Sequence, residues 1–354
     1  MKKILSILQL PPPIHGASLM NQLVLESKQI SNEFQINHLQ LSLSKNNFKE
    51  NKIFKFLNFI SLIYSLLKLK CSKFDIIYIT PSVSGVSIIK DLLIVFVSKI
   101  IFKSNIVLHF HNFGLKENNY VPRIIKKYIF SNVTIILNSI NLKSDIPNYL
   151  KNITIKYCQS CLPEKYNVIN ARRNPIPNIL FYSNILKSKG ILEFIEIIKK
   201  LENKIELTFT IAGDFYEYSE IELIEIIKNQ KIISKYKILG KINKNEKEII
   251  FSNADVYVNP SHFETFGITL LESLWFNTPV VCSNIGGTSD IINNNSNGFL
   301  IELYNIDSFV EAILKLLIDL DLYDRFVKNG NKLVKNKYQT QNFEMRLLKI
   351  FNEL

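Results

Sequence analysis

The segment that decides the fold runs from Asn259 to Val281 and reads NPSHFETFGITLLESLWFNTPVV. It predicts a short strand ending at Asn259, a polar loop, an apolar periodic helix beginning near Gly267, and a further apolar strand starting at Pro279. This succession is the repeating unit of a parallel sheet. Because Gly267 has no side chain, the first backbone amides of the helix are open to an anion such as a phosphate.

The same rhythm of short apolar strands and longer helical stretches continues along the chain of 354 residues. A single core rarely extends over so long a chain, so we expect two domains. The strands of the first domain, apolar enough to be buried on both faces, are Lys3–Leu8, Ile76–Thr80, Asn105–His109 and Thr134–Asn138. The strands of the second are Ile179–Ser183, Leu207–Ala212, Tyr236–Leu239, Val256–Asn259 and Pro279–Cys282. The proline-containing run Arg172–Pro177 is the expected linker, which gives domains 1–174 and 175–338.

Positive charge is concentrated in the first half of the chain. Residues 1–175 hold 23 Lys and Arg against 8 Asp and Glu, a net of +15, whereas the remainder holds 20 against 23, a net of −3. An anionic partner is therefore expected on the first domain: nucleic acid, an anionic membrane or a lipid-phosphate substrate. Two stretches of the first domain combine apolar and basic residues, Lys52–Lys70 and Ile88–Lys103. Their uninterrupted apolar runs are too short to span a bilayer. They are either helices buried against a sheet or a basic amphipathic face on a membrane.

The chain start and the cysteines indicate a reducing compartment. The first apolar run contains only about five apolar residues and is followed by Gln9 and Pro11. A run this short favours a buried strand over a signal peptide. With four cysteines in a long chain, we expect a cytoplasmic protein without disulfides. Cys158 and Cys161 have the spacing of a metal or redox half-site, but the sequence offers no second pair. We therefore expect no metal.

Two glutamates, Glu264 and Glu272, flank the predicted helix start. If the chain between them were helical, they would lie about 12 Å apart, too far to share a proton. Ionised carboxylates are acceptors that suit the vicinal hydroxyls of a ribose or a hexose. Spacing alone is equally compatible with two solvent-facing glutamates that the helix dipole favours.

The surroundings of this pair resemble the donor-site signature of the family-4 retaining glycosyltransferases, the "glycosyl transferases group 1" type. That signature is a Glu, seven residues and a Glu, preceded by Pro-Ser and followed by a Pro-Val-Val strand, and all three parts are present. The Gly-Gly loop at Gly286 and the turn and strand from Asn297 also look like those of the family. The resemblance extends upstream to Ile179. It implies the GT-B fold, two Rossmann-like α/β domains whose parallel sheets face each other across a cleft, with residues 339–354 returning as a helix to the first domain.

The resemblance assigns roles to residues of the second domain. Glu264 would contact hydroxyls of the transferred sugar and Glu272 would hold the ribose. Lys189, at the end of a strand-loop segment, matches the lysine that binds the donor diphosphate. Ser183 and Asn184 stand where the family usually carries an arginine. Either Lys187 or the Ser183 hydroxyl and the Asn184 amide would compensate for it at the diphosphate. Backbone groups expected beside the nucleotide or its phosphates belong to Gly213, Gly240, Phe266, Gly267 and Ile268.

The first domain offers fewer candidates. Gly16 lies in a loop that is similar to the family's opening loop beneath the donor phosphates, and His15 and Ser18 beside it are candidates for contact with phosphate or acceptor. Alternation places His109 and His111 on one face of a predicted strand. Ligands bind at the carboxyl ends of such strands, and the resemblance selects His111 as the histidine near the reacting carbon of the donor sugar. His109 as a buried core histidine is the alternative.

The activity that the resemblance implies is retaining transfer of a hexosyl unit from a nucleotide diphosphate sugar to an acceptor hydroxyl, without a metal or other cofactor. A lipid-linked glycan of surface polysaccharide or lipopolysaccharide biosynthesis would explain the basic first domain, through peripheral contact with the anionic inner face of the cell membrane. A catalytically silent scaffold of the same fold and a basic nucleic-acid-binding protein are the alternatives. The aromatic residues show no RNA-binding pattern, so we do not expect nucleic acid.

Overall fold

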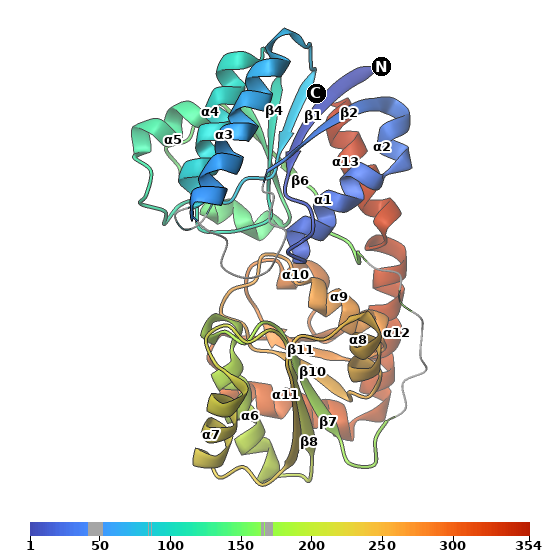
Figure 1. Ribbon diagram of the computed structural model, residues 1–354. Helices are drawn as coiled ribbons and strands as arrows, with labels where there is room; N and C mark the ends of the chain where they lie inside the picture. The colour runs from blue at the N-terminus through green and yellow to red at the C-terminus, as the bar shows by residue number, and fades with distance from the viewer. Residues whose placement is uncertain (42–51, 84, 86, 164–165, 167–172) are drawn as a thin grey trace. The chain divides into compact units, whose positions relative to one another are not determined.

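The computed structural model describes residues 1–41, 52–83, 85, 87–163, 166 and 173–354. The chain forms two compact units (Figure 1). Unit 1 comprises Met1–Pro163 with Thr340–Leu354, and unit 2 comprises Glu164–Gln339. The boundary therefore precedes the 174/175 boundary expected from the sequence. Two residues of the expected linker are bonded into unit 2, since Arg173 donates to the carbonyl of Leu317 and Asn174 to the carboxylate of Asp255.

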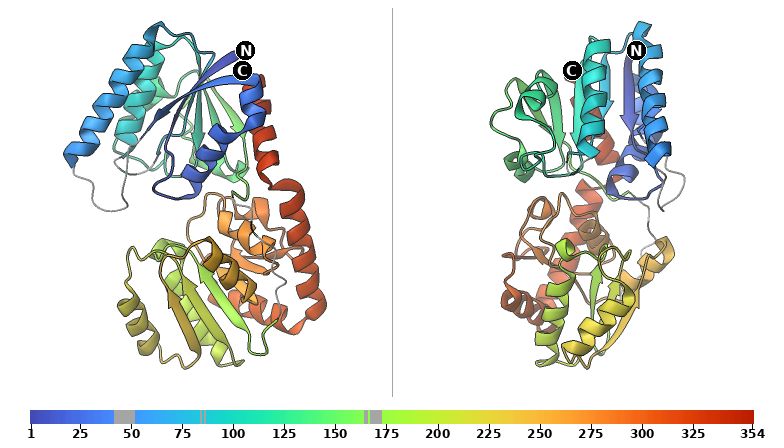
Figure 2. Two further views of the ribbon diagram at one scale, coloured as in Figure 1. Left: turned by 45° about the vertical axis from the view of Figure 1, so that its right-hand side comes forward. Right: turned by 60° about the vertical axis from the view of Figure 1, so that its left-hand side comes forward.

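Unit 1 is built on a six-stranded parallel sheet in the order β2-β1-β3-β4-β5-β6. Its strands are β1 (Lys2–Leu8), β2 (Phe34–Gln40), β3 (Ile76–Ile79), β4 (Asn105–Phe110), β5 (Val133–Leu137) and β6 (Ile153–Tyr157). Its helices are α1 (Gly16–Glu26), α2 (Lys28–Glu33), α3 (Lys52–Lys68), α4 (Ser87–Ile101), α5 (Arg123–Ile129) and α13 (Thr340–Asn352), with short 3-10 turns at Leu69–Cys71 and Ile140–Asp145. Helices α3, α4 and α5 cover one face of the sheet, and α1, α2 and α13 cover the other (Figure 2).

Unit 2 has a second six-stranded parallel sheet in the order β12-β11-β10-β7-β8-β9. Its strands are β7 (Asn178–Tyr182), β8 (Thr208–Ala212), β9 (Lys235–Leu239), β10 (Val256–Asn259), β11 (Val280–Ser283) and β12 (Gly298–Ile301). Its helices are α6 (Ile191–Glu202), α7 (Glu220–Asn229), α8 (Lys244–Ser252), α9 (Ile268–Trp275), α10 (Thr288–Ile291), α11 (Ile306–Ile318) and α12 (Leu320–Lys337), and Lys187–Lys189 form a 3-10 turn. Helix α6 packs against α11, and α9 against α12.

Both sheets confirm the predicted α/β class with parallel strands. Their central strands are buried on both faces, as the apolar runs predicted: every residue of β3 and of β10 is buried. Strands β2 and β6 were not predicted. They are the two edge strands of the unit 1 sheet, and most of their residues are partly exposed or exposed. An edge strand can carry polar side chains, which removes the apolar run that identifies a buried strand.

Strand order fixes where ligands can approach each sheet. In unit 2 the chain passes from β7 outward to β9 and then returns to the other side of β7, so β7 and β10 are neighbours. In unit 1 the same reversal makes β1 and β3 neighbours. Loops that follow such a pair of strands diverge and form the usual binding crevice of an open parallel sheet.

Within the described ranges, no helix combines the length and apolar character needed to cross a membrane.

Candidate active site

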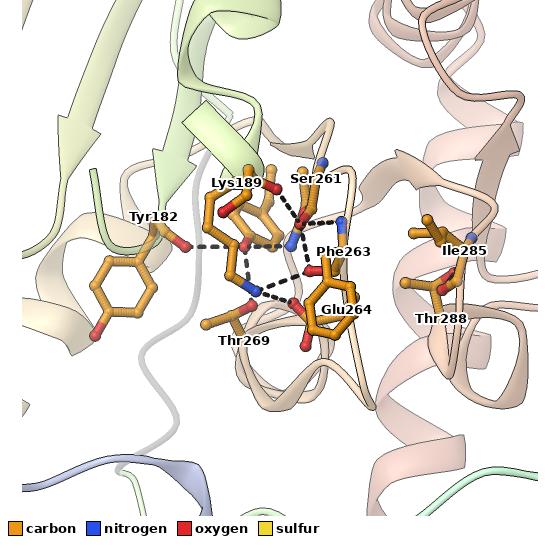
Figure 3. A network of polar contacts seen from close by, with 11 residues as sticks. Tyr182, Lys189, Ser261, Phe263, Glu264, Thr269, Ile285 and Thr288 are labelled. Carbon is orange, nitrogen blue, oxygen red and sulfur yellow. Dashed lines mark hydrogen bonds and ion pairs between the residues drawn. The ribbon is translucent and has the colours of Figure 1, made fainter. Parts of the chain in front are cut away.

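The loops after β7 and β10 bring together two of the three charged residues predicted to hold the donor in unit 2. Lys189 follows β7 and Glu264 follows β10. The Lys189 ammonium donates to Oε2 of Glu264 at 3.0 Å and to the carbonyl of Phe263 at 3.0 Å (Figure 3). Both side chains are only partly exposed, so a positive and a negative group lie adjacent at the edge where ligands approach the sheet.

Glycines allow these loops to approach one another. Gly190 has φ +78°, and a Cβ there would lie 2.1 Å from the carbonyl oxygen of Pro260. Gly286 has φ +54°, and a Cβ there would lie 1.8 Å from the carbonyl oxygen of Glu264. The next amide, that of Gly287, donates to the same oxygen at 3.3 Å. The backbone of Glu264 is thus held by direct contact with the Gly-Gly loop after β11.

Helix α9 presents its N-terminus beside this pair. It begins at Ile268, and Gly267 is its N-cap residue, with φ +99° and no side-chain hydrogen bond to the first turn. Phe266 is buried and anchors the approach to the helix. The backbone amides of this turn can receive an anion, as expected from the sequence. Since α9 begins at Ile268, Glu264 and Glu272 do not share one helix, and the 12 Å estimate for a continuous helix does not apply.

Glu272 lies in the interior of unit 2, with 3% of its surface exposed. Its Oε1 accepts hydrogen bonds from the hydroxyl of Tyr166 at 2.6 Å and from the ammonium of Lys247 at 2.8 Å. The Lys247 ammonium also donates to the Tyr166 hydroxyl at 2.9 Å. A ribose hydroxyl that approached this oxygen would therefore compete with Tyr166. Sequence reasoning missed both partners, because neither belongs to a motif.

The remaining candidates of unit 2 lie in the loops after β7, β8 and β9. Ser183 is partly buried, Asn184 is exposed and the Lys187 side chain is exposed. Gly213 has φ +144°, and a Cβ there would lie 1.8 Å from the carbonyl oxygen of Ser183. A Cβ at Gly240 would lie 3.0 Å from the ring of Phe215. These two glycines therefore allow neighbouring loops of the protein itself to pack closely, a structural reason for glycine that the sequence did not reveal.

In unit 1 a chain of hydrogen bonds ends at His111. The Tyr78 hydroxyl lies 2.7 Å from Nδ1 of His109, whose Nε2 lies 3.0 Å from Oδ1 of Asn138. The Asn138 amide nitrogen lies 3.2 Å from Nδ1 of His111. Since an amide oxygen only accepts and an amide nitrogen only donates, His109 carries its proton on Nε2 and accepts from Tyr78 at Nδ1. His111 must then accept at Nδ1.

In this network both imidazoles are neutral, and one imidazole N–H group makes no hydrogen bond to the described residues. Burial lowers the pKa of His109 to about 4. Burial, together with the neighbouring His109, places the pKa of His111 well below its ordinary value. A neutral His111 that accepts at Nδ1 carries its proton on Nε2, and this buried atom has no hydrogen-bonding partner among the described residues. His111 thus has an N–H donor to offer, and His109 serves as a buried link that orients it.

His15 and Ser18 cap the first helix of unit 1. The amide of Ser18 donates to Nδ1 of His15 at 3.2 Å, and the amide of His15 donates to the Ser18 hydroxyl at 3.0 Å. This reciprocal pair is a capping box at the N-terminus of α1, which begins at Gly16. The structure therefore gives both side chains a local role, and leaves Gly16 in the loop that follows β1.

The buried pair of histidines makes stability sensitive to acid. Above pH 6.5 the His109 ring is neutral in the folded and in the unfolded chain. As the pH falls from 6.5 towards 4, the unfolded chain takes up a proton that the buried ring does not, so stability is lost in that window, by about 3 kcal/mol for this ring. We expect urea midpoints to fall between pH 7 and pH 4.5, and to fall less in His109→Asn. The matched substitution His38→Asn, at a partly exposed ring, should leave most of the pH dependence. If the urea midpoint changed equally with pH in the wild type, His109→Asn and His38→Asn, the pH dependence would not come from His109.

Part of the chain is similar in sequence to known glycosyltransferases. The family model described as "Glycosyl transferases group 1" matches residues 163–333. The capsular polysaccharide biosynthesis glycosyltransferase CapM of Staphylococcus aureus is 26% identical over 176 residues, which cover 49% of this chain and 45% of that protein. The alignments span 45% of CapM and 44% and 25% of two further relatives, whereas the uncharacterized glycosyltransferase MJ1178 of Methanocaldococcus jannaschii, 27% identical over 70% of this chain, is covered over 68% of its length.

Solved structures extend the likeness to the whole chain. Sucrose-phosphate synthase from Thermosynechococcus elongatus superposes with a TM-score of 0.78 at 14% identity, over 100% of this chain and 99% of that one. HepE of Anabaena, solved in complex with UDP-glucose, superposes with a TM-score of 0.70 at 15% identity over 100% of both chains. The two parallel sheets thus define a protein of GT-B fold. The residues that match the glycosyl transferases group 1 model, 163–333, include the whole sheet of unit 2 and the Lys189–Glu264 pair.

Proposed function

We propose that this protein is a retaining glycosyltransferase that moves a hexosyl unit from a nucleotide diphosphate sugar to an acceptor hydroxyl. The observation that carries the proposal is the Lys189–Glu264 pair beside the N-terminus of α9, at the point where the strand order of unit 2 reverses. A cation and a helix N-terminus suit a diphosphate, and a neighbouring carboxylate suits sugar hydroxyls. The likeness to HepE, which was solved with UDP-glucose, supports a donor of this kind.

The proposed reaction is a substitution at the anomeric carbon of the donor. The acceptor oxygen forms a bond to that carbon on the face from which the diphosphate leaves, and the acceptor proton passes to an oxygen of the leaving diphosphate. Negative charge then grows on the diphosphate, where Lys189 and the first amides of α9 stabilise it. Glu264 accepts from the sugar hydroxyls. In unit 1, the Nε2 proton of His111 is available to a hydroxyl of a ligand.

For the acceptor, we propose a glycan or a lipid-linked glycan of surface polysaccharide or lipopolysaccharide assembly. The name of CapM, a relative in capsular polysaccharide biosynthesis, supports this class. The net charge of +15 in residues 1–175 supports a phosphate-bearing lipid and a peripheral contact with an anionic membrane.

A donor panel tests the proposed function. Each nucleotide sugar would be incubated with the full chain, and slow hydrolysis would be followed by nucleotide release, with calorimetric binding of the free nucleoside diphosphates in parallel. We expect one base to bind with micromolar affinity and its sugar to be hydrolysed. The absence of arginine at Ser183 favours the alternative of a silent scaffold, and a chain that binds no nucleoside diphosphate would support that alternative.

The hydroxyl of Tyr166 offers a direct test of the ribose site. If Glu272 holds the ribose, Tyr166→Phe removes a competitor for its Oε1. A hydrogen bond to a charged group corresponds to about 1.5–3 kcal/mol, so nucleoside diphosphate binding should tighten at least about tenfold. Calorimetry would measure this, with Tyr236→Phe as the control, since Tyr236 lies near the start of β9, at the opposite end of the strand from the candidate binding loops. Weaker binding in Tyr166→Phe would mean that the hydroxyl contacts the ligand instead.

A further inference from the structure

We propose that the outer surfaces of α3, α4 and α5 in unit 1 form a docking face for an anionic lipid bilayer. We call it the α3–α5 face, and define it by the exposed apolar side chains Ile60 and Leu67 of α3, Ile89 and Ile100 of α4, and Ile124 and Tyr128 of α5. The three helices cover the same side of the unit 1 sheet (Figures 1 and 2). This inference rests on the proposed function in one respect: docking on the bilayer would bring unit 1 to a membrane-bound acceptor.

Helix α4 carries the clearest part of the pattern. Its inner side packs into the core through residues such as Leu92 and Val95. The opposite stripe, at helical spacing i, i+4, i+7, i+8 and i+11, contains no polar side chain and consists of Ile89, Leu93, Phe96, Val97 and Ile100. Ile100 is 63% exposed. A helix that faces water normally carries polar residues on this stripe, so an apolar outer stripe indicates a surface that meets something other than water.

The apolar surface is continuous across the three helices. Between α3 and α4 lies an open groove of about 410 Å³ that is lined by Tyr64 and by apolar side chains, among them Ile60, Leu67, Leu93 and Val97. On the other side of α4, the ring of Phe96 packs against that of Tyr128, with centroids 5.7 Å apart. Helix α5 then adds Ile124, which is 77% exposed. A groove of this kind suits a lipid chain, and the exposed side chains suit shallow insertion at the membrane interface.

Charge distinguishes a bilayer from a second copy of this chain. Residues 52–129 hold twelve Lys and Arg against three Asp and Glu, a net of +9. One of the three acids, Asp91, is buried and accepts from the amide of Ser82. Exposed lysines close to the three helices in the sequence include Lys70, Lys103 and Lys127. Two copies joined through this face would bring these cations together, whereas anionic headgroups would neutralise them.

Vesicle binding by matched variants tests the inference without requiring glycosyl transfer. Co-sedimentation of the full chain would be measured with phosphatidylglycerol vesicles and with phosphatidylcholine vesicles, at low and at high salt. The face variant is Ile89→Glu with Ile100→Glu. The control is Ile221→Glu with Ile233→Glu, which makes the same charge change at two isoleucines of unit 2 that are 70% and 89% exposed. A single change on α5, Ile124→Glu, provides a second face variant.

We expect the wild type to bind phosphatidylglycerol vesicles at low salt and to bind them less at high salt. The face variant should bind at least about tenfold more weakly, and the control should match the wild type within about twofold. Thermal melting and nucleoside diphosphate binding would show that the variants are folded. A chain that binds vesicles but no nucleoside diphosphate would overturn the proposed function and leave this inference standing.

Three results would overturn the inference. The first is a wild type that ignores phosphatidylglycerol vesicles at low salt. The second is vesicle binding that neither Ile124→Glu nor the double face variant weakens. The third is a wild-type dimer in analytical ultracentrifugation that the face variant dissociates, because the face would then join two copies of the chain.

Discussion

Replacing Glu264 by Gln is expected to lower kcat for hexosyl transfer by about 10²–10³, while nucleoside diphosphate binding changes little. The carboxylate oxygen that receives Lys189 would be lost as a charged acceptor, and a site that relies on charge complementarity to the transition state loses about this much when one group is removed. Binding of the free nucleoside diphosphate, which has no hexose, should depend instead on Lys189 and the start of α9. Rates of transfer or of slow donor hydrolysis would be compared with calorimetric Kd values.

Glu202 provides the matched control for this substitution. It is another glutamate of unit 2 with little exposed surface, and it forms an ion pair with Lys199 at 2.8 Å away from the loops after β7 and β10. Glu202→Gln removes a similar charge and should reduce stability without a comparable loss of kcat. If Glu264→Gln retained wild-type kcat, the proposed role of Glu264 in holding the transferred sugar would be wrong.

Substituting Gly286 by Ala is expected to damage the same site through the backbone. The added Cβ would lie 1.8 Å from the carbonyl oxygen of Glu264, and the residue would keep φ +54°, a conformation that costs an L-residue about 1–2 kcal/mol. Since that oxygen belongs to the backbone, the loop that carries Glu264 must move. We expect unit 2 to lose about 3 kcal/mol of stability and transfer to fall at least about 100-fold. Thermal unfolding and kcat would be measured on the same preparations.

Gly85→Ala separates the backbone strain from the close contact. Gly85 has φ +64°, and among the residues that the structure describes a Cβ there would meet no atom within 4 Å. It should therefore cost only the conformational strain, about 1 kcal/mol. If Gly286→Ala cost no more than Gly85→Ala and kept full activity, the contact between Gly286 and Glu264 would not be what positions the glutamate.

Burial explains why most of the central strands could be predicted from the sequence. Strands such as β3, β5 and β10 have every residue buried, and their short apolar runs predicted their place to within a residue or two. Strand β2 lies at an edge of the unit 1 sheet and contains Gln35, Asn37 and His38, so no such run marks it. The edge strand β6 has no buried residue and was not predicted either. Burial does not account for every strand, because β9 is also an edge strand without a buried residue and was predicted from Tyr236–Leu239.

The candidate site was only partly accessible from the sequence. Glu264, Gly267 and Glu272 stand in one motif, so their association with the start of α9 was predicted from that motif and its resemblance to a family. Tyr166 and Lys247 lie 106 and 25 residues from Glu272 and stand in no motif, yet they are bonded to it. The link from Tyr78 to His111 was hidden in the same way, because it passes through Asn138, the residue that follows the neighbouring strand β5.

The sequence by itself determined the parallel α/β class, the positions of the buried strands and the residues of the glutamate motif, because each depends on a local pattern of apolar spacing or on one short segment. Only the tertiary structure decided that Lys189 pairs with Glu264, 75 residues away. Strand order, which brings β7 beside β10, places those two loops together. The tertiary structure also decided that α4 has an apolar outer stripe, because the two sides of a helix become inner and outer only when a sheet covers one of them.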